Sequence, residues 1–180
     1  MKKFYTSEGD DGITGLLGEE RVSKNHPRIQ AVGAVDEASA ALGFARAQSE
    51  DSEINHLVKK VQEDLYQMMS LLVLEKSNPE KFPELKKSQV EWLEQNIDHY
   101  GEFVDQPPGF ILPGESLTSA AFGVARTVVR RAERAVSFIY ESSLLTSENI
   151  LPYLNRLSSL CFVLELYTSE YPPSPAGKNS

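Results

Sequence analysis

The chain has 180 residues, of which 26 are acidic and 18 basic, and its formal net charge is −8. This length predicts one domain, and the acidic balance argues against general nucleic-acid binding, which favours a basic surface. No apolar run is long enough to span a bilayer, the N-terminus lacks the apolar region of a signal peptide, and the single cysteine excludes a disulfide framework. We therefore expect a cytoplasmic protein without membrane partners.

Residues 1–26 are expected to form an irregular N-terminal arm. Its glycines recur at positions 9, 12, 15 and 18. They match neither a Walker A loop nor a Rossmann fingerprint, because no strand precedes them and no Gly-Lys-Ser/Thr appears. Such glycines would let backbone N–H groups approach a ligand, and Lys24 would add positive charge to an anion site. A flexible arm with a solvent-exposed lysine is the alternative that the spacing leaves open.

The rest of the chain is expected to be helical. Apolar residues recur at helical spacing over 27–48, 53–75, 84–100, 117–142 and about 149–170. Asn78 and Pro79 are expected to end the second helix, and Gly101 the third. No segment alternates convincingly with period two, so the fold class is all-α, an up-and-down bundle of five helices over 27–170. The tail 171–180 is rich in Pro, Gly and Ser and is expected to be disordered.

The stretch 110–134, FILPGESLTSAAFGVARTVVRRAER, is the most unusual part of this acidic chain. Ser116 is a plausible helix cap. Arg126, Arg130 and Arg134 follow at i, i+4 and i+8, so they share one face and repel by ~0.2–0.5 kcal/mol per neighbouring pair. They therefore need anionic partners. Either nearby acids neutralise a solvated face, or the row binds an anion, most naturally a polyphosphate, which arginine grips bidentately.

Asp36 lies on the same side of the first helix as Ile29 and Val32. A carboxylate on an apolar face is costly unless it is paired. The conspicuous cations are those of the arginine helix, so we expect Asp36 to pair with Arg126 or Arg130. The alternative is that Asp36 lies at the edge of this face and is hydrated.

Several kinds of chemistry are excluded. The histidines at 26, 56 and 99 are isolated, so we expect no metal site built from protein side chains. No Gly-x-Ser-x-Gly motif is present, and Cys161 lacks an obvious activating base and is expected in the core. The remaining residues suit a reaction in which the protein positions and neutralises while the substrates supply the chemistry.

Three blocks together resemble the PduO-type ATP:cob(I)alamin adenosyltransferase family. YTSEGDDGITGLLGEERVSKNHPRIQAVGAVDE resembles the family's nucleotide-binding segment, the arginine stretch resembles its FILPGG turn and arginine helix, and YLNRLSSLCF is similar to its NRLSD helix. The blocks cover about a third of the chain in the family's order. The resemblance implies a ferritin-like five-helix bundle assembled as a homotrimer, with active sites between subunits.

The resemblance also implies the reaction. The 5′-deoxyadenosyl group of ATP would move to the cobalt of a reduced corrinoid, cob(I)alamin, giving adenosylcobalamin and triphosphate. Cobalt(I) is the nucleophile, so no side-chain nucleophile is needed, and Mg²⁺ would accompany ATP. A corrinoid reductase or an adenosylcobalamin-dependent enzyme would be a fitting partner.

Site residues carry over from the matching positions. In the arm, the resemblance assigns nucleotide binding to Thr6, Ser7, Glu8, Gly9, Ile13, Thr14, Gly15 and Lys24. In the bundle, it assigns nucleotide binding to Arg130, Arg131, Ala132, Glu133, Arg134 and Asn155. It places Phe110 and Phe162 on the lower face of the corrinoid, and it makes Asp36 and Arg126 a salt bridge that shapes the site beside the catalytic Arg130.

Four positions depart from the family pattern. Glu8 replaces Thr or Asn, Ser39 replaces Asn, Glu115 replaces the second glycine of FILPGG, and Ser159 replaces the aspartate of NRLSD. These changes motivate an alternative, in which the same trimer binds ATP and corrinoid for delivery or sensing with weak or no turnover. The sequence does not say which corrinoid is preferred.

Overall fold

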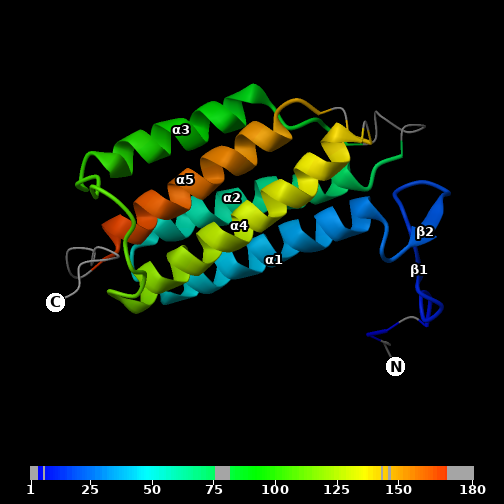
Figure 1. The fold of residues 1–180 in the computed structure, drawn as a ribbon, viewed down its shortest axis with the longest axis horizontal. Helices are drawn as coiled ribbons and strands as arrows, with labels where there is room; N and C mark the ends of the chain where they lie inside the picture. The colour runs from blue at the N-terminus through cyan, green and yellow to red at the C-terminus, as the bar shows by residue number, and fades with distance from the viewer. Residues whose placement is uncertain (1–3, 6, 76–81, 143, 146, 170–180) are drawn as a thin grey trace.

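The computed structural model describes residues 4–5, 7–75, 82–142, 144–145 and 147–169. The described elements, in chain order, are β1 (Ile13–Gly15), β2 (Arg21–Ser23), α1 (Pro27–Gln48), α2 (Ser52–Leu72), α3 (Lys87–Gly101), α4 (Leu117–Glu141) and α5 (Ile150–Tyr167). Successive helices run in alternating directions along the bundle (Figure 1). The predicted all-α, up-and-down bundle is therefore confirmed. The predicted disordered tail lies outside the described residues.

The side chains at the N-caps of α1, α2 and α4 accept hydrogen bonds from backbone N–H groups of the first turn. The Ser116 hydroxyl accepts a hydrogen bond from the backbone N–H of Ser119 at 3.0 Å, which confirms the predicted cap of α4. The Asp51 carboxylate accepts from the N–H groups of Glu53 and Ile54 and begins α2. Pro27 occupies the first turn of α1, where its missing N–H costs nothing.

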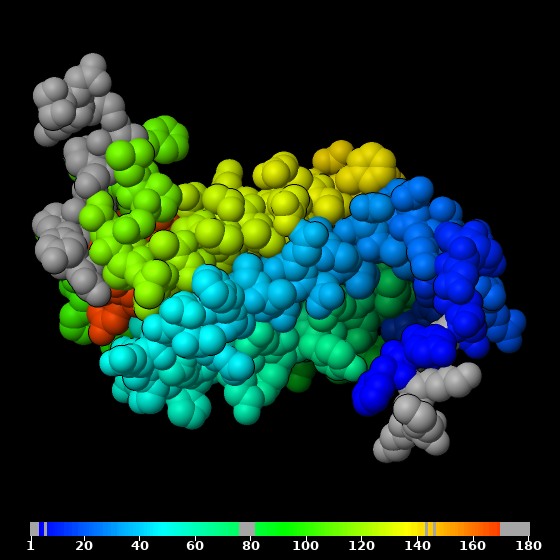
Figure 2. Space-filling model, turned by 90° about the horizontal axis from the view of Figure 1, so that it is seen from below, coloured from blue at the N-terminus to red at the C-terminus, as the bar shows by residue number. Residues whose placement is uncertain are grey.

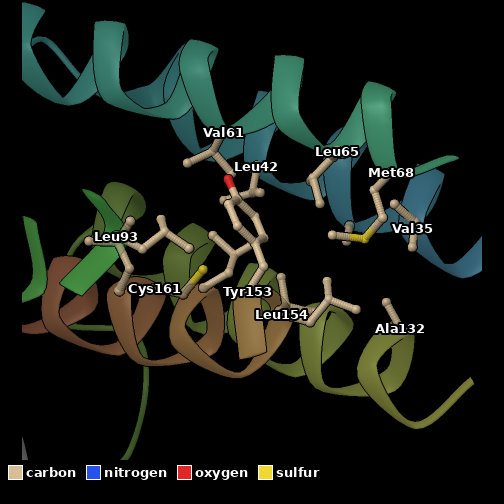
Figure 3. Packing of buried hydrophobic residues seen from close by; sticks show 14 of the residues in the cluster. Val35, Leu42, Val61, Leu65, Met68, Leu93, Ala132, Tyr153, Leu154 and Cys161 are labelled. Carbon is tan, nitrogen blue, oxygen red and sulfur yellow. The ribbon is translucent and has the colours of Figure 1, made fainter. Parts of the chain in front are cut away.

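The core lies between all five described helices. Tyr153, Leu154 and Cys161 of α5 point toward Val61 and Leu65 of α2 (Figure 3). The face that α1 buries is built largely from small residues, and α1 packs most extensively against α4. The members of this face are Ala31, Val35, Ala38, Leu42 and Ala45. Small side chains let two helix backbones approach closely. The helices α1 and α4 therefore lie side by side, and together they form one outer surface of the bundle (Figure 2).

One carboxylate inside the core is fully satisfied. Asp64 is 2% exposed and accepts hydrogen bonds from the Tyr153 hydroxyl at 3.0 Å and from Lys60 Nζ and Gln89 Nε2 at 2.7 Å. Burial, with the neighbouring Asp64, raises the pKa of Tyr153 well above its usual value. The network therefore joins α2, α3 and α5 without leaving an unpaired charge.

The N-terminal arm is more regular than the sequence predicts. β1 and β2 pair antiparallel, with Thr14 opposite Val22, and the ribbon lies at one end of the bundle (Figure 1). Behind it, the Leu17 N–H donates to the Val73 carbonyl at 2.9 Å. This contact fixes the arm to the end of α2. The expectation of a wholly irregular arm is therefore wrong, because three-residue strands are too short to show alternation.

Arg28 joins the arm, α2 and the end of α4. Its guanidinium is buried and donates to the carbonyls of Leu72 at 3.2 Å, Leu74 at 2.6 Å and Leu144. Burial lowers the pKa of Arg28 from its usual value. These contacts satisfy carbonyls at the end of α2, which explains why this helix stops at Leu72 rather than at 75. The stop signal expected at 78–79 lies outside the described residues.

No helix among the described residues is long and apolar enough to cross a membrane.

Candidate functional site

The arginine row of α4 divides into paired and unpaired members. Arg126 Nε donates to Glu165 Oε2 of α5 at 3.2 Å, and Arg131 pairs with Glu37 of α1. Arg130 is exposed, and Arg134 donates to the Arg130 carbonyl at 3.0 Å. Within the described part of the chain, neither Arg130 nor Arg134 has a carboxylate in salt-bridge range. These two guanidinium groups are therefore available to an anionic ligand.

A cavity of about 490 Å³ lies between α4, α5 and the loop before α4. Its lining residues are Gly109, Phe110, Ile111, Arg126, Arg130, Ser158, Ser159, Phe162 and Val163. Phe110 is 89% exposed in the single chain, which is unusual for so large an apolar side chain. The Arg126 guanidinium lies 5.8 Å from the centre of the Phe162 ring. This cleft combines aromatic surface with positive charge.

The cleft brings the two predicted corrinoid residues together with one predicted nucleotide residue of the bundle, Arg130. Phe110, Phe162, Arg126 and Arg130 all line it, and they come from the loop before α4, from α4 and from α5. Ser159, which replaces an acidic residue of the family pattern, also lines it. Their juxtaposition is a structural finding, and their roles stay a prediction.

The next turn of α4 and α5 carries a polar network. Asn155 Nδ2 donates to Glu133 Oε1 at 3.1 Å, and Asn155 Oδ1 accepts from Arg156 Nη1 at 2.7 Å. Arg156 is in turn held by Glu94 at 2.8 Å. Ala132, the neighbour of Glu133, is buried in the core and offers only its backbone to a ligand. The network orients the two predicted nucleotide residues Glu133 and Asn155 toward each other.

The glycine loop, residues 7–15, lies against Lys24, which is exposed as the alternative prediction has it. Gly9 has φ +96° and Gly12 has φ +78°, backbone conformations that favour glycine. A Cβ added at Gly9 would lie 3.3 Å from both Cε and Nζ of Lys24, so the lysine side chain crosses directly over this glycine. Gly12 accepts a hydrogen bond from the Lys24 N–H at 2.9 Å. The backbone of the glycine loop and the Lys24 ammonium group therefore lie on the same small surface of the arm.

The other predicted arm residues surround this surface. Ser7 and Glu8 are exposed, Ile13 and Thr14 are half-buried and Gly15 is exposed. Ile13 N–H donates to Asp11 Oδ1 at 3.0 Å, which tightens the turn before β1. Thr6 lies outside the described residues. The loop carries exposed acidic side chains, so an anionic ligand would rely on backbone N–H groups and Lys24.

The single chain does not bring the glycine loop to the cleft. Arg131 contacts Glu37, which lies ten residues along α1 from Pro27. At ~1.5 Å per residue, this is about 15 Å along the bundle, and Arg126 lies more than one further turn away. The arm therefore lies at one end of the bundle, and the cleft lies away from it along the bundle.

The predicted pair between Asp36 and Arg126 or Arg130 is wrong within one chain. Asp36 is exposed, Ile29 and Val32 are only half-buried, and the buried face of α1 is centred on Val35. The hydrated alternative therefore describes Asp36 in the single chain. The carboxylate on Arg126 is Glu165, because α5 is the helix that packs beside this part of α4.

Two functional candidates were absent from the sequence prediction. Glu165 is 1% exposed, and burial raises its pKa from its usual value while Arg126 opposes the shift. The sequence contains a signal for Glu165, because this residue is a lone carboxylate in the apolar run LCFVLELY. Arg28 gave no such signal, since its partners are backbone carbonyls. Cys161 is buried as expected, and burial raises its pKa to about 12, so it is no nucleophile.

A family model described as cobalamin adenosyltransferase matches residues 4–168. A corrinoid adenosyltransferase of Mycobacterium tuberculosis is 40% identical over 172 residues, covering 91% of this chain and 87% of the relative. One from Bos taurus is 34% identical over 176 residues, covering 94% and 72%. A variant of the PduO-type ATP:corrinoid adenosyltransferase of Lactobacillus reuteri, solved with cobalamin and ATP, superposes with TM-score 0.89 at 29% identity over 96% of this chain and 98% of that chain.

Proposed function

Because this chain belongs to the cobalamin adenosyltransferase family, we propose that its aromatic and cationic cleft is the place where a reduced corrinoid accepts the 5′-deoxyadenosyl group of ATP. The chain is an ATP:corrinoid adenosyltransferase. The observation that carries the assignment of the site is the cleft that joins Phe110 and Phe162 to the unpaired Arg130. Its aromatic rings can contact a flat apolar ligand. The Arg130 guanidinium beside them can bind a polyphosphate.

The reaction requires little covalent chemistry from the protein. The cobalt(I) electron pair attacks C5′ of ATP, the Co–C bond forms, the C5′–O5′ bond breaks and triphosphate leaves with the bonding pair. Arg130 and Arg134 neutralise the leaving group, because no carboxylate among the described residues pairs with either guanidinium. Glu133 and Asn155, hydrogen-bonded to each other, hold the nucleoside end. Lys24 and the N–H groups of the glycine loop hold the rest of the nucleotide.

The Phe110 and Phe162 side chains act on the corrinoid. In this proposal they cover its lower face and keep water and other axial ligands away from the cobalt. An apolar surface there favours four-coordinate cobalt, which makes reduction to cobalt(I) easier. The exposure of Phe110 in the single chain supports this role, since covering it with a corrinoid removes apolar surface from water.

Mg²⁺ belongs to the nucleotide in this proposal. No group of three or more His, Cys, Asp or Glu side chains suited to a metal gathers among the described residues. Magnesium bound to nucleotides usually retains several waters and uses phosphate oxygens with one or two carboxylates, so it does not need such a cage. Glu133 is the carboxylate best placed to assist, because it lies beside Arg130 and Arg134 in sequence and faces Asn155.

The complete site forms between subunits of a homotrimer. The separation of the glycine loop from the cleft supports this arrangement, since the arm of one subunit would complete the cleft of the next. Exposed apolar side chains on the α1–α4 surface also support it, because they gain from burial: Phe44, Val124 and Phe138 are each more than half exposed. Asp36 would then be free to approach Arg126 of a neighbouring subunit. Localisation in the cytoplasm is part of the same proposal.

The test is an adenosylation assay with ATP, Mg²⁺ and chemically reduced cobalamin, followed by the visible spectrum of adenosylcobalamin. We expect wild-type turnover and a fall in kcat/KM of about 10²–10³-fold in Arg130→Ala, the size of effect seen when one charge-stabilising group is removed. Arg46→Ala, which removes an arginine that does not line the cleft, should stay within about twofold. Binding of ATP and corrinoid without product would favour the delivery or sensing alternative.

A further inference from the structure

Glu165 is a buried carboxylate with one ionic partner. It is 1% exposed in the interior of α5, and its Oε2 accepts a hydrogen bond from Arg126 Nε at 3.2 Å. Its Oε1 is buried and finds no hydrogen-bond partner among the described residues. A buried charge held by a single partner is costly, and removing that partner is more costly still. Such a residue needs a role that an apolar side chain would not fill.

The partner of Glu165 is a wall of the cleft. The Arg126 side chain is 28% exposed, lines the cavity and lies with its guanidinium 5.8 Å from the centre of the Phe162 ring. Phe162 and Glu165 are three residues apart on α5, so they lie on one face, one above the other. Glu165 therefore holds the guanidinium at its Nε, while the same guanidinium lies over the Phe162 ring. The position of the Glu165 carboxylate therefore determines where the Arg126 guanidinium lies in the cleft.

Gly123 provides the space that Glu165 occupies. A Cβ at this position of α4 would lie 2.8 Å from Glu165 Oε1, 3.2 Å from its Cδ and 3.3 Å from Cβ of Pro113. Glycine in a helix interior costs ~0.5–1 kcal/mol relative to alanine. Gly123 and Arg126 are one turn apart on α4 and face Glu165 together. We call the four residues Gly123, Arg126, Phe162 and Glu165 the carboxylate anchor.

We propose that Glu165 is a positioning residue for the corrinoid, which acts through Arg126 and does not touch the substrate itself. It fixes the Arg126 guanidinium against Phe162 and so sets the width and charge of the cleft before the corrinoid binds. This inference rests on the proposed function of the cleft. It adds a residue from inside α5 to a site whose other members line the cavity surface.

The anchor is tested by two substitutions that disturb the same carboxylate from opposite sides. Glu165→Ala removes it, and Gly123→Ala pushes on it from a position of α4 that does not line the cleft, although the same methyl group also meets Pro113. We expect each to raise the KM for cob(I)alamin about tenfold, while the KM for ATP stays within about twofold, because only the corrinoid half of the site is disturbed. The affinity for cob(II)alamin, measured by equilibrium dialysis in the presence of ATP, should fall by the same factor.

Two further variants separate positioning from packing. Gly123→Ala combined with Glu165→Ala should bind the corrinoid no more weakly than Glu165→Ala alone, because the added methyl group then meets only Cβ of Pro113 at 3.3 Å, and an added loss in the double variant would indicate that the Pro113 loop moves instead. Glu165→Gln keeps the shape and an acceptor for Arg126 Nε, so its KM for cob(I)alamin should stay within about threefold of wild type. Far-ultraviolet circular dichroism and a thermal melt identify any variant that does not fold. Glu165→Ala, which introduces no clash, carries the test if Gly123→Ala fails.

The outcomes distinguish the two proposals. Unchanged corrinoid KM and affinity in Glu165→Ala, with wild-type turnover intact, overturn the positioning role and leave the proposed function standing. Equal losses for ATP and corrinoid also overturn it, since they indicate a general structural effect. A wild-type chain that binds no corrinoid overturns both. Selective loss of corrinoid binding in both single variants, without added loss in the double variant, supports the anchor whether or not turnover is slow.

Discussion

Replacing Arg28 with methionine should destabilise the protein and release the N-terminal arm together. Methionine keeps much of the length and apolar stem of arginine but removes every donor. Three carbonyls, those of Leu72, Leu74 and Leu144, then lose their charged partner. An unpaired buried polar group costs ~1–3 kcal/mol, and the loss is partly offset because a guanidinium no longer has to be desolvated. We therefore expect the free energy of unfolding to fall by about 2–4 kcal/mol.

Denaturant unfolding followed by circular dichroism measures this loss, and hydrogen exchange locates it. For a domain of this size, 1 kcal/mol corresponds to ~2–4 °C in Tm, so Tm should fall by about 4–16 °C. The amide of Leu17, which donates to Val73, should exchange faster than in wild type. Arg46→Met removes a half-exposed arginine of the same helix and serves as the control, with an expected change below ~1 kcal/mol. If the unfolding free energy of Arg28→Met also changed by less than ~1 kcal/mol, the proposed role of Arg28 would be refuted.

Three further predictions concern other parts of the chain. Cys161 has its pKa raised by burial from 9.0 to about 12, so its contribution to stability is complete below about pH 9 and is lost as the pH rises toward 12. Between pH 9 and 10 the unfolding free energy of Cys161→Ala should therefore fall less steeply than that of wild type. The two slopes should differ by up to ~1.4 kcal/mol per pH unit, and equal slopes would contradict this. Phe44→Glu, on the exposed α1 surface, should lower the trimer fraction in a solution mass measurement while Glu50→Gln does not. Phe162→Ala should raise the KM for corrinoid about tenfold or more and leave that for ATP within twofold, and an equal effect on both would contradict its place on the corrinoid side.

The helices follow closely from local sequence patterns. The first predicted helix has the observed bounds 27–48, and that of the arginine stretch ends one residue late, because apolar periodicity and the Ser116 cap act within a few residues. The end of α2 was misplaced, since it is set by Arg28 and Leu17 from distant parts of the chain. The arm ribbon was missed for the same reason.

At the site, the composition of the cleft was predicted through the family resemblance, but the partner of Arg126 was not. The argument used for Asp36, that a carboxylate on an apolar face needs a cation, applies with more force to Glu165. Helical periodicity identified which residues share a face but not which helix lies opposite. Only the packing of α4 against α5 decides that Glu165 meets Arg126 in this chain.

The crossing of Lys24 over Gly9 has a consequence for the thermodynamics of nucleotide binding. A free lysine side chain loses up to ~1.5–2 kcal/mol of rotamer entropy when it is fixed. Here the lysine stem already rests on the bare Cα of a glycine, within 3.3 Å of where a Cβ would stand. Much of that entropic loss therefore falls on folding rather than on binding. A methyl group at position 9 would press on the lysine side chain and on the Ile13 carbonyl oxygen, 3.0 Å away, at a φ of +96° that side chains rarely adopt, so Gly9→Ala should displace the ammonium and make nucleotide binding less favourable in calorimetry.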